Sequence, residues 1–202
     1  MLMPHIHSYS AAKKGVVVYL EGLPGCGKTS TLEKLSTDYI TLPEIFINGD
    51  VAEFHNLPIQ TFFLKNDEQK LEKSEISEKT VIVDRSPLST LFFNKAKHEV
   101  DPSHDSESII EWFNNVIEPK ISSSNCHFIL IDIPANLSLK RKNREVNLND
   151  PWANPSTLEL IRKMFIERSK AYPSQFVVLD GRKEYAQILS DVREQISKYE
   201  QN

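Results

Sequence analysis

The chain has 202 residues, of which 40% are hydrophobic, and it carries a formal net charge of −4 with a sequence pI near 5.9. A chain of this length buries a substantial core, and it suits one α/β domain with a lid better than two domains. The acidic balance gives no general attraction to a phosphate backbone, so nucleic acid is a disfavoured partner. Two cysteines provide neither a disulfide framework nor a metal-ligand cluster.

The first residues of the chain are polar and aperiodic, and we expect a flexible tail at 1–14 followed by a single domain at 15–202. No stretch approaches the roughly eighteen continuous apolar residues of a membrane span. The tail also lacks the apolar stretch of a signal peptide. These features predict a soluble, cytoplasmic protein without a membrane partner.

A predicted buried strand at 15–21 runs directly into a glycine-rich loop, GLPGCGKT at 22–29. The loop matches the phosphate-binding pattern G-x-x-x-x-G-K-[ST], and a helix is predicted to open at Thr29. Glycines let backbone N–H groups approach a polyphosphate closely. We therefore predict that Lys28 reaches the β- and γ-phosphates of ATP and that the Thr29 hydroxyl holds Mg²⁺. The predicted nucleotide contacts are Gly22, Leu23, Pro24, Gly25, Cys26, Gly27, Lys28, Thr29 and Ser30.

Two further predicted strands lead to acidic side chains. The segment 39–43 is a short candidate strand that ends at a proline, and Glu44 follows it. The segment 80–84 places four β-branched residues before Asp84, which indicates a third buried strand. Between these strands, 59–79 has a helix-like composition that is apolar early and charged late.

Strand-like and helix-like segments alternate over the rest of the chain. Buried strands are predicted at 127–133 and 176–180. Helices are predicted from Ser86 and Pro87 to about Lys97, from Asp105 or Ser106 to Ile117, over 137–144, from Asn154 or Ser156 to before Pro173, and over 185–199. This alternation predicts a doubly wound parallel sheet, whose ligands bind at the carboxyl ends of the strands.

Several charged side chains fall at those carboxyl ends, where phosphoryl transfer needs a base and cations. Glu44 is the candidate base for the acceptor's hydroxyl proton. Asp84 ends its strand where an acid reaches the Mg²⁺ shell, and Asp132 is the weaker alternative. Arg85 is a candidate contact of the acceptor or of a phosphate, with a structural ion pair as its alternative role.

A basic run, KRKNR at 140–144, leads into an asparagine-rich segment without periodicity, and we expect a lid at about 141–155. Charge runs are usually solvated faces of helices. Here the neighbouring lid favours another role, because lid arginines can close on the phosphates and exclude water. Arg141 and Arg144 lie one predicted helical turn apart and are the candidates for this role.

The helix-like segment after Pro58 supplies candidates for the acceptor pocket. Phe62 and Phe63 are able to stack on a ring, although aromatic side chains at helical spacing more often belong to the core. Asn66 and Gln69 add polar groups to the same segment.

In combination, these motifs resemble the thymidylate kinase and deoxyribonucleoside kinase superfamily of P-loop kinases. The resemblance spans nearly the whole chain in order. It rests on VYLEG at 18–22 with the phosphate loop, Leu42-Pro43-Glu44, Asp84-Arg85-Ser86, and the arginine-rich run before the lid. It implies a three-layer α/β fold with a five-stranded parallel sheet in the order 2-3-1-4-5 and a helical lid.

The resemblance also implies a role for individual residues. Glu44 would be the base on a sugar hydroxyl, while Asp84 and Arg85 would act at the acceptor and the metal. Arg141 and Arg144 would be the lid arginines. The adenine of ATP would lie near Asp180-Gly181-Arg182, which follows the last strand. Homodimers are common in these families, and the helix that carries Trp112 is a candidate interface.

The predicted function is ATP- and Mg²⁺-dependent phosphoryl transfer to a hydroxyl of a nucleoside or nucleoside monophosphate. The acceptor stays open, because Ile45-Phe46 replaces the proline and tryptophan of nucleoside kinases and Ser86 replaces the tyrosine of thymidylate kinases. One alternative is a nucleotide-driven switch or partner-binding ATPase, although no water-orienting residue is identifiable. Another is a kinase of a different small hydroxylated molecule or of a modified base in DNA.

Overall fold

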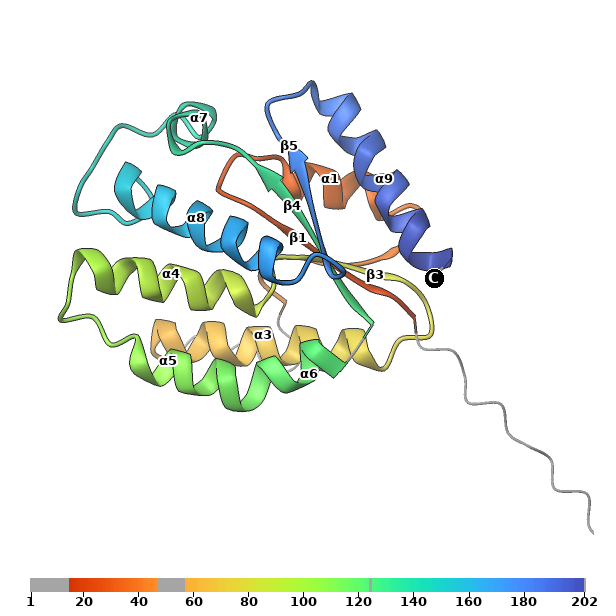
Figure 1. Ribbon diagram of the computed structural model, residues 1–202, viewed down its shortest axis with the longest axis horizontal. Coiled ribbons are helices and arrows are strands. Elements are labelled where there is room, and N and C mark those ends of the chain that lie inside the picture. Colours follow the sequence, from red (N-terminus) through yellow and green to blue (C-terminus); the bar gives the residue numbers. More distant parts are fainter. Residues whose placement is uncertain (1–14, 47–56, 124, 202) are drawn as a thin grey trace, which may run out of the picture.

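The computed structural model describes residues 15–46, 57–123 and 125–201, so the predicted tail at 1–14 lies outside the described residues (Figure 1). The strands of the described chain form one parallel sheet: β1 (Val17–Glu21), β2 (Ile40–Leu42), β3 (Val81–Asp84), β4 (Cys126–Asp132) and β5 (Phe176–Asp180). Their order is β2-β3-β1-β4-β5. This topology confirms the predicted fold class.

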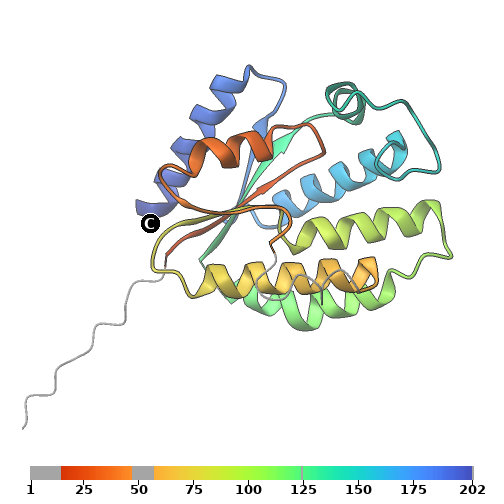
Figure 2. The same cartoon turned by 180° about the vertical axis from the view of Figure 1, so that it is seen from behind.

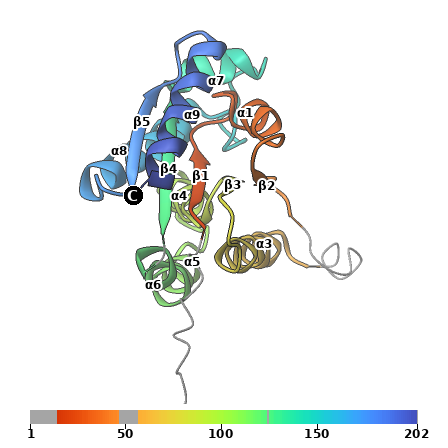
Figure 3. The ribbon, with the colours of Figure 1, turned by 90° about the vertical axis from the view of Figure 1, so that its right-hand side faces the viewer.

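Helices cover both faces of this sheet. They are α1 (Lys28–Leu35), α3 (Ile59–Glu75), α4 (Pro87–Val100), α5 (Glu107–Trp112), α6 (Glu118–Ser123), α7 (Ala135–Arg141), α8 (Pro155–Ala171) and α9 (Tyr185–Gln201). Helices α1 and α9 lie on one face, in front in Figure 2, and α4 and α8 lie on the other. Figure 3 shows the strands between α8 and α1, which gives three layers. No helix in the described part of the chain is long and apolar enough to cross a membrane.

The strands are covered on both faces, which explains their nearly continuous apolar sequences. All five residues of β1 are buried, and so are all four of β3. The register sets Tyr19 beside Phe128 and Phe128 beside Phe176. These rings stack with centroid distances of 5.2 and 4.4 Å, so they join β1, β4 and β5 inside the core.

Two helix starts have the caps that the sequence predicts. The Ser86 side chain accepts a hydrogen bond from the Leu88 N–H, and a proline occupies the first turn of α4. Of the two starts that the sequence allows for α8, the structure has the one capped by Asn154. Its Oδ1 accepts from the N–H groups of Ser156 and Thr157. Both caps direct a helix away from the carboxyl ends of the strands.

The helix predicted to begin near Asp105 contains a π-helical turn. Asp105 Oδ1 accepts from the Glu107 and Ser108 N–H groups, which fixes the start of α5. The chain then widens over Phe113–Ile117, where the N–H of Glu118 bonds to the Phe113 carbonyl, before α6 continues. Pro119 lacks the N–H that would continue an α-helical ladder, and this accounts for a wider turn just before it.

The predicted helix at 137–144 is wrong at its carboxyl end. Helix α7 stops at Arg141, and Asn143 takes a left-handed conformation with φ 50°. The Asn143 N–H bonds to the Lys140 carbonyl, and the Arg144 N–H bonds to the Leu139 carbonyl. This pattern is a Schellman C-cap, and asparagine tolerates the left-handed position that the motif needs. Residues 142–154, called the lid segment below, then run in turns to α8.

Candidate active site

The glycine-rich loop turns from β1 into α1 with its glycines at positive φ, 135° at Gly22, 77° at Gly25 and 106° at Gly27. At Gly22 a Cβ atom would lie 2.4 Å from the Ile131 carbonyl oxygen, so a larger residue cannot fit. The side chain of Lys28 is buried against the loop, and its Nζ donates to the Gly22 carbonyl at 2.7 Å. The loop therefore combines close backbone approach with a fixed cation, which is what a polyphosphate site requires.

Thr29 and Asp84 meet where α1 begins and β3 ends. Thr29 Oγ1 donates to Asp84 Oδ2 at 2.9 Å. Asp84 is buried, and its Oδ1 has no hydrogen-bond partner among the described residues. A hydroxyl beside an unpaired carboxylate oxygen fits Mg²⁺, which takes one or two protein ligands and completes its shell with phosphates and water.

Asp132, the weaker alternative for the metal, is already paired. Arg162 of α8 donates through Nε to Oδ1 at 2.7 Å and through Nη2 to Oδ2 at 2.8 Å. Such a bidentate pair occupies both carboxylate oxygens. The donor set at the carboxyl end of β3 therefore suits a cation better than the one at β4.

Glu44, after β2, and Arg85, after β3, form an ion pair with 2.7 Å between Glu44 Oε1 and Arg85 Nε. The backbone of Arg85 is left-handed, with φ 62°, and its Nη1 donates to Ser89 Oγ at 3.3 Å. Partial burial opposes ionisation of Glu44, but the positive charges of Arg85 and Lys28 outweigh this effect and lower its pKa. Glu44 is thus a carboxylate held in one orientation by a cation.

Glu21, the last residue of β1, is a site residue to which the sequence analysis assigns no role. It is fully buried, and both the backbone N–H of Ser86 and the Ser89 hydroxyl donate to its carboxylate at 2.7 Å. Burial raises the Glu21 pKa, and the bonds from Ser86 and Ser89 offset part of that increase. Glu21 joins β1 to the start of α4 and so holds the turn that carries Arg85. The sequence signal for this role is an acidic residue at the end of an otherwise apolar strand.

One face of α3 holds the turn that carries Glu44. Asn66 Nδ2 donates to the Glu44 carbonyl at 3.0 Å, and Asn66 Oδ1 accepts from the Phe46 N–H at 2.7 Å. One helical turn later, Lys70 Nζ lies 3.0 Å from the Arg85 carbonyl oxygen. The sequence analysis predicts a substrate contact for Asn66, but its side-chain amide binds backbone groups, and this geometry supports a positioning role.

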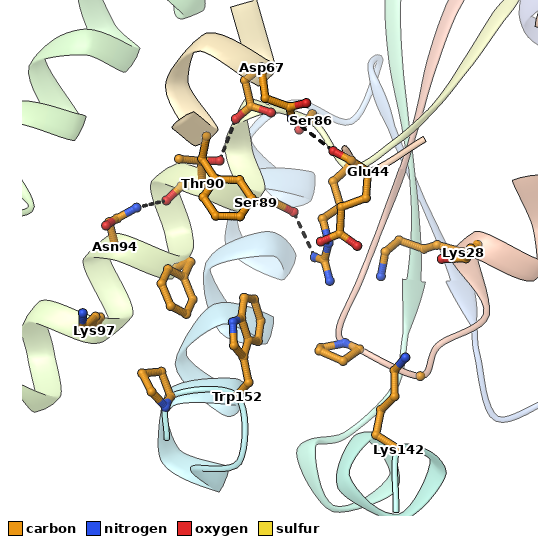
Figure 4. Close-up of a pocket in the computed structure, with 18 of the residues that line it drawn as sticks. Lys28, Glu44, Asp67, Ser86, Ser89, Thr90, Asn94, Lys97, Lys142 and Trp152 are labelled. Atoms are coloured by element: carbon orange, nitrogen blue, oxygen red, sulfur yellow. Dashed lines mark hydrogen bonds and ion pairs between the residues drawn. The ribbon is translucent and has the colours of Figure 1, made fainter. Parts of the chain in front are cut away.

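A cavity of about 720 Å³ lies between the glycine-rich loop, α3, α4 and the lid segment (Figure 4). The predicted site residues that line it are Pro24, Gly25, Gly27, Lys28, Thr29, Ser30, Glu44, Phe63, Asn66, Arg85, Arg141 and Arg144. Phe62, another predicted site residue, is not part of the lining. Its ring packs edge-on against that of Phe63, with the ring centroids 5.3 Å apart. Gly181 also lies outside the lining, where a Cβ would be 2.7 Å from Ile133 Cγ2. The structure thus brings most of the predicted site together.

Trp152 of the lid segment projects into this cavity, as Figure 4 shows. Its ring stacks on Phe93 of α4 with centroids 4.6 Å apart, and the Arg85 guanidinium carbon lies 5.6 Å from the Trp152 ring centroid. Arg144 Nη1 donates to the Trp152 carbonyl at 3.1 Å. The lid segment is therefore anchored by an aromatic side chain that the sequence analysis leaves out.

Comparison with known proteins identifies the fold. No protein-family model matches the chain. A structure of deoxyadenosine kinase from M. mycoides with bound dATP matches 90% of this chain and 100% of that chain, with a TM-score of 0.67 and 16% identity. Another, with the products dCMP and a flexible dCDP bound, matches 91% and 100%, with a TM-score of 0.67 and 17% identity. This chain has the P-loop nucleoside kinase fold.

In this nucleoside kinase fold, the two predicted lid arginines reach the cavity from different local structures. Arg141 ends α7 and its Nη1 donates to the Gly25 carbonyl at 3.4 Å, while the Ser138 hydroxyl of the same helix donates to the Pro24 carbonyl at 2.7 Å. Arg144 lies beyond the helix, in the lid segment. Helix α7 therefore packs directly on the phosphate loop and places basic side chains at its rim.

The cavity of this nucleoside kinase fold is positively charged on a chain whose net charge is −4. The basic residues among its described lining are Lys28, Lys70, Arg85, Lys97, Arg141, Lys142 and Arg144, against the acids Glu44 and Asp67. Clefts lined by one sign of charge concentrate ligands of the opposite sign. The basic surplus of this lining therefore suits an anionic ligand such as a polyphosphate.

Proposed function

We propose that the chain is a Mg·ATP-dependent kinase that transfers phosphate to a hydroxyl of a nucleoside, with Glu44 as the base. The observation that carries this proposal is the Glu44–Arg85 ion pair, which lies in the same cavity as Lys28 and Thr29 of the phosphate loop. A carboxylate beside a phosphate site is what acceptance of a hydroxyl proton requires.

Each group of this site has a task in such a reaction. The loop N–H groups and Lys28 would bind the phosphates, and Thr29 and Asp84 would hold Mg²⁺, which would neutralise phosphate charge. Arg85 orients Glu44 so that the carboxylate takes the proton of the acceptor's hydroxyl as its oxygen bonds to the γ-phosphorus, the bond from that phosphorus to the β-phosphate oxygen breaks, and ADP leaves. Arg141 and Arg144, at the rim of the cavity, exclude water that would otherwise hydrolyse ATP.

The surroundings of Glu44 favour a nucleoside over a nucleoside monophosphate as acceptor. Asn66, which binds the Glu44 carbonyl, and Ser89, which binds the Arg85 guanidinium, are uncharged polar groups of the cavity lining. The nearest cation, Arg85, is paired with Glu44. An uncharged nucleoside needs no further cation beside Glu44. The fold shared with a deoxyadenosine kinase supports the same acceptor class.

The first experiment incubates the protein with Mg·ATP and a pool of nucleosides and nucleoside monophosphates. ADP release is followed against a control without acceptor, and products are identified by mass. A phosphorylated nucleoside is the expected product. ADP release that is independent of every acceptor would instead favour the nucleotide-driven switch.

Replacing the base gives the sharpest test of mechanism. We expect Glu44→Gln to lower kcat by about 10²- to 10⁴-fold, because the amide cannot take up the hydroxyl proton. ATP affinity should stay near wild type, because Glu44 follows β2 and is not part of the phosphate loop. The matched control is Glu111→Gln, which changes an exposed glutamate of α5 and should leave kcat unchanged. Normal turnover of Glu44→Gln would contradict the assignment of the base.

A further inference from the structure

Lys70 is a buried charge that the reaction proposed above does not use. It lies in the middle of α3, and only 1% of it is exposed. Lysine is almost never fully buried unless its ammonium is paired, because desolvation of the charge is costly. The groups that pair with its ammonium therefore indicate the role of this buried lysine.

Three of these partners are backbone carbonyls at the carboxyl ends of two strands. Lys70 Nζ lies 3.0 Å from the Arg85 carbonyl oxygen, 3.1 Å from that of Asp84 and 3.4 Å from that of Glu44. The Glu44 turn follows β2 and the Asp84-Arg85 turn follows β3, so one ammonium group joins both catalytic turns. Asn66, one turn earlier on α3, binds the Glu44 carbonyl as well.

Asp67, the fourth partner, connects this ammonium to α4. Asp67 Oδ1 lies 3.5 Å from Lys70 Nζ, and Asp67 Oδ2 accepts from the Thr90 hydroxyl at 2.6 Å (Figure 4). The Asp67 pKa is raised by burial, which Lys70 and Thr90 partly offset. Lys70 is thus the point at which α3, α4 and both catalytic turns meet.

The backbone at Arg85 explains why this position needs a cation. Arg85 is in the left-handed region, with φ 62°, which is unfavourable for a residue with a Cβ. The carbonyls of Asp84 and Arg85 flank that kink and both accept from Lys70. A cation with several N–H donors can satisfy both carbonyls together, whereas an apolar side chain would leave them buried and unpaired.

We propose that Lys70 is a positioning residue that fixes Glu44 and Arg85 relative to each other by binding the backbone of both turns. This proposal rests on the kinase function proposed above only for its effect on catalysis. Its effect on Glu44 is electrostatic as well and exists in the protein alone. Lys70 of α3, Arg85 after β3 and Lys28 of α1 all direct positive charge at the Glu44 carboxylate.

The test compares the wild type with Lys70→Met, which keeps an unbranched side chain of similar length but removes the charge and the donors. We expect kcat to fall about 10- to 100-fold, because the base and Arg85 lose their common anchor. The KM for ATP should change less than kcat, because the phosphate loop does not contact Lys70. The Glu44 pKa should rise, so the acid limb of the kcat profile moves to higher pH.

A second readout does not depend on activity. NMR titration of the labelled glutamate carboxyls, with Glu44→Gln to assign the resonance, measures the Glu44 pKa in the wild type and in Lys70→Met. A raised value in the variant is expected. An unchanged Glu44 pKa together with an unchanged kcat would overturn the role of Lys70. Absence of phosphorylated product from the wild type would overturn the proposed function and leave the pKa comparison to decide on Lys70.

Two further variants separate positioning from general destabilisation. Ser74→Ala removes another buried polar group of α3, whose hydroxyl donates to the Leu71 carbonyl at 2.8 Å, and it should leave kcat and the pH profile unchanged. Where Lys70→Met does not fold, Lys70→Arg keeps the charge. We expect Lys70→Arg to retain the acid limb of the wild type and to lower kcat, because the planar guanidinium cannot reproduce the contacts of the ammonium group. Wild-type kcat in Lys70→Arg would contradict positioning by the ammonium.

Discussion

The ion pair between Glu44 and Arg85 bears on the two alternative roles that the sequence leaves open for Arg85. An arginine paired with a carboxylate is the structural alternative to an arginine at a reaction centre. Here the partner is the candidate base itself, 2.7 Å away, and Ser89 holds the other side of the guanidinium. The sequence predicts which residues reach this end of the sheet, because parallel strands end together. It does not predict their backbone supports, Lys70 and Asn66, because a helix composition alone does not show which polar side chains turn inward.

Glu21 gives a prediction on pH and stability. Its pKa is raised in the folded protein above the ordinary value of 4.5, chiefly by burial. As pH rises, the carboxyl therefore ionises first in the unfolded chain, and the folded state loses stability until pH passes the folded pKa. We expect the stability of Glu21→Gln to be close to that of the wild type at low pH and to exceed it increasingly as pH rises through this window. Denaturant unfolding at a series of pH values measures the difference.

The comparison between the two proteins removes the contribution of other carboxyls, many of which have lowered pKa values and act with the opposite sign. Asp180, whose pKa Arg182 lowers to about 2, is one of them. A stability difference between wild type and Glu21→Gln that stays constant with pH would contradict a raised pKa at Glu21. Because Glu21 holds the Arg85 turn, activity of the variant is measured separately.

At the scale of elements, the lid segment and α4 form one wall of the cavity through Trp152 and Phe93. The loop that presents Trp152 is built from local bonds, with Asp150 Oδ1 accepting from the Trp152 N–H at 2.9 Å and Asn154 Nδ2 donating to the Leu148 carbonyl at 3.1 Å. Ring stacking then fixes the segment on α4. A basic run and an aperiodic sequence indicate a lid, but they do not identify the residue that anchors it.

We expect Trp152→Ala to raise the KM for the nucleoside several-fold and to change the KM for ATP much less, because the indole lines the acceptor's part of the cavity. In a Trp112→Phe background, Trp152 is the only tryptophan of the chain. Its fluorescence should then change when a nucleoside is added. For the KM measurement the control is Trp112→Phe, because Trp112 lies outside the cavity lining, where it donates to Glu68 of α3. An unchanged or lower nucleoside KM in Trp152→Ala would contradict a contact with the acceptor.

For the molecule as a whole, the alternation of apolar strands with helices predicts the parallel direction of the strands, and the resemblance of four motifs to P-loop kinases implies their order. Two departures lie in backbone details. Pro119 forces a π-helical turn in a helix predicted as regular, and Asn143 ends α7 before Arg144. Both features depend on the backbone chemistry of one residue, which an analysis of hydrophobic periodicity does not take into account. The homodimer through the Trp112 helix stays a prediction.

Nucleotide binding should stabilise the fold, because the phosphate loop forms a binding site only in the folded chain. Mg·ATP at a hundred times its Kd adds about 2.7 kcal/mol, which raises Tm by about 5 to 10 °C in a chain of this size. We expect Asp84→Asn to lose much of the Mg²⁺-dependent part of this shift, since Asp84 Oδ1 is the unpaired oxygen beside Thr29. Thermal unfolding of wild type and Asp84→Asn with ATP, in the presence and absence of Mg²⁺, measures the Tm shift and its Mg²⁺-dependent part. An equal Mg²⁺ dependence in Asp84→Asn would contradict its role as a ligand.

The brevity of β2 has a consequence for solubility. It is the outermost strand on its side of the sheet, and an outermost strand offers unpaired backbone groups to strands of other molecules. Among the described residues this edge strand spans only Ile40–Leu42, and Pro43, which follows, has no N–H to donate. The proline that turns the chain toward Glu44 thus also shortens the template for intermolecular β-pairing, and we expect it to limit aggregation through this edge.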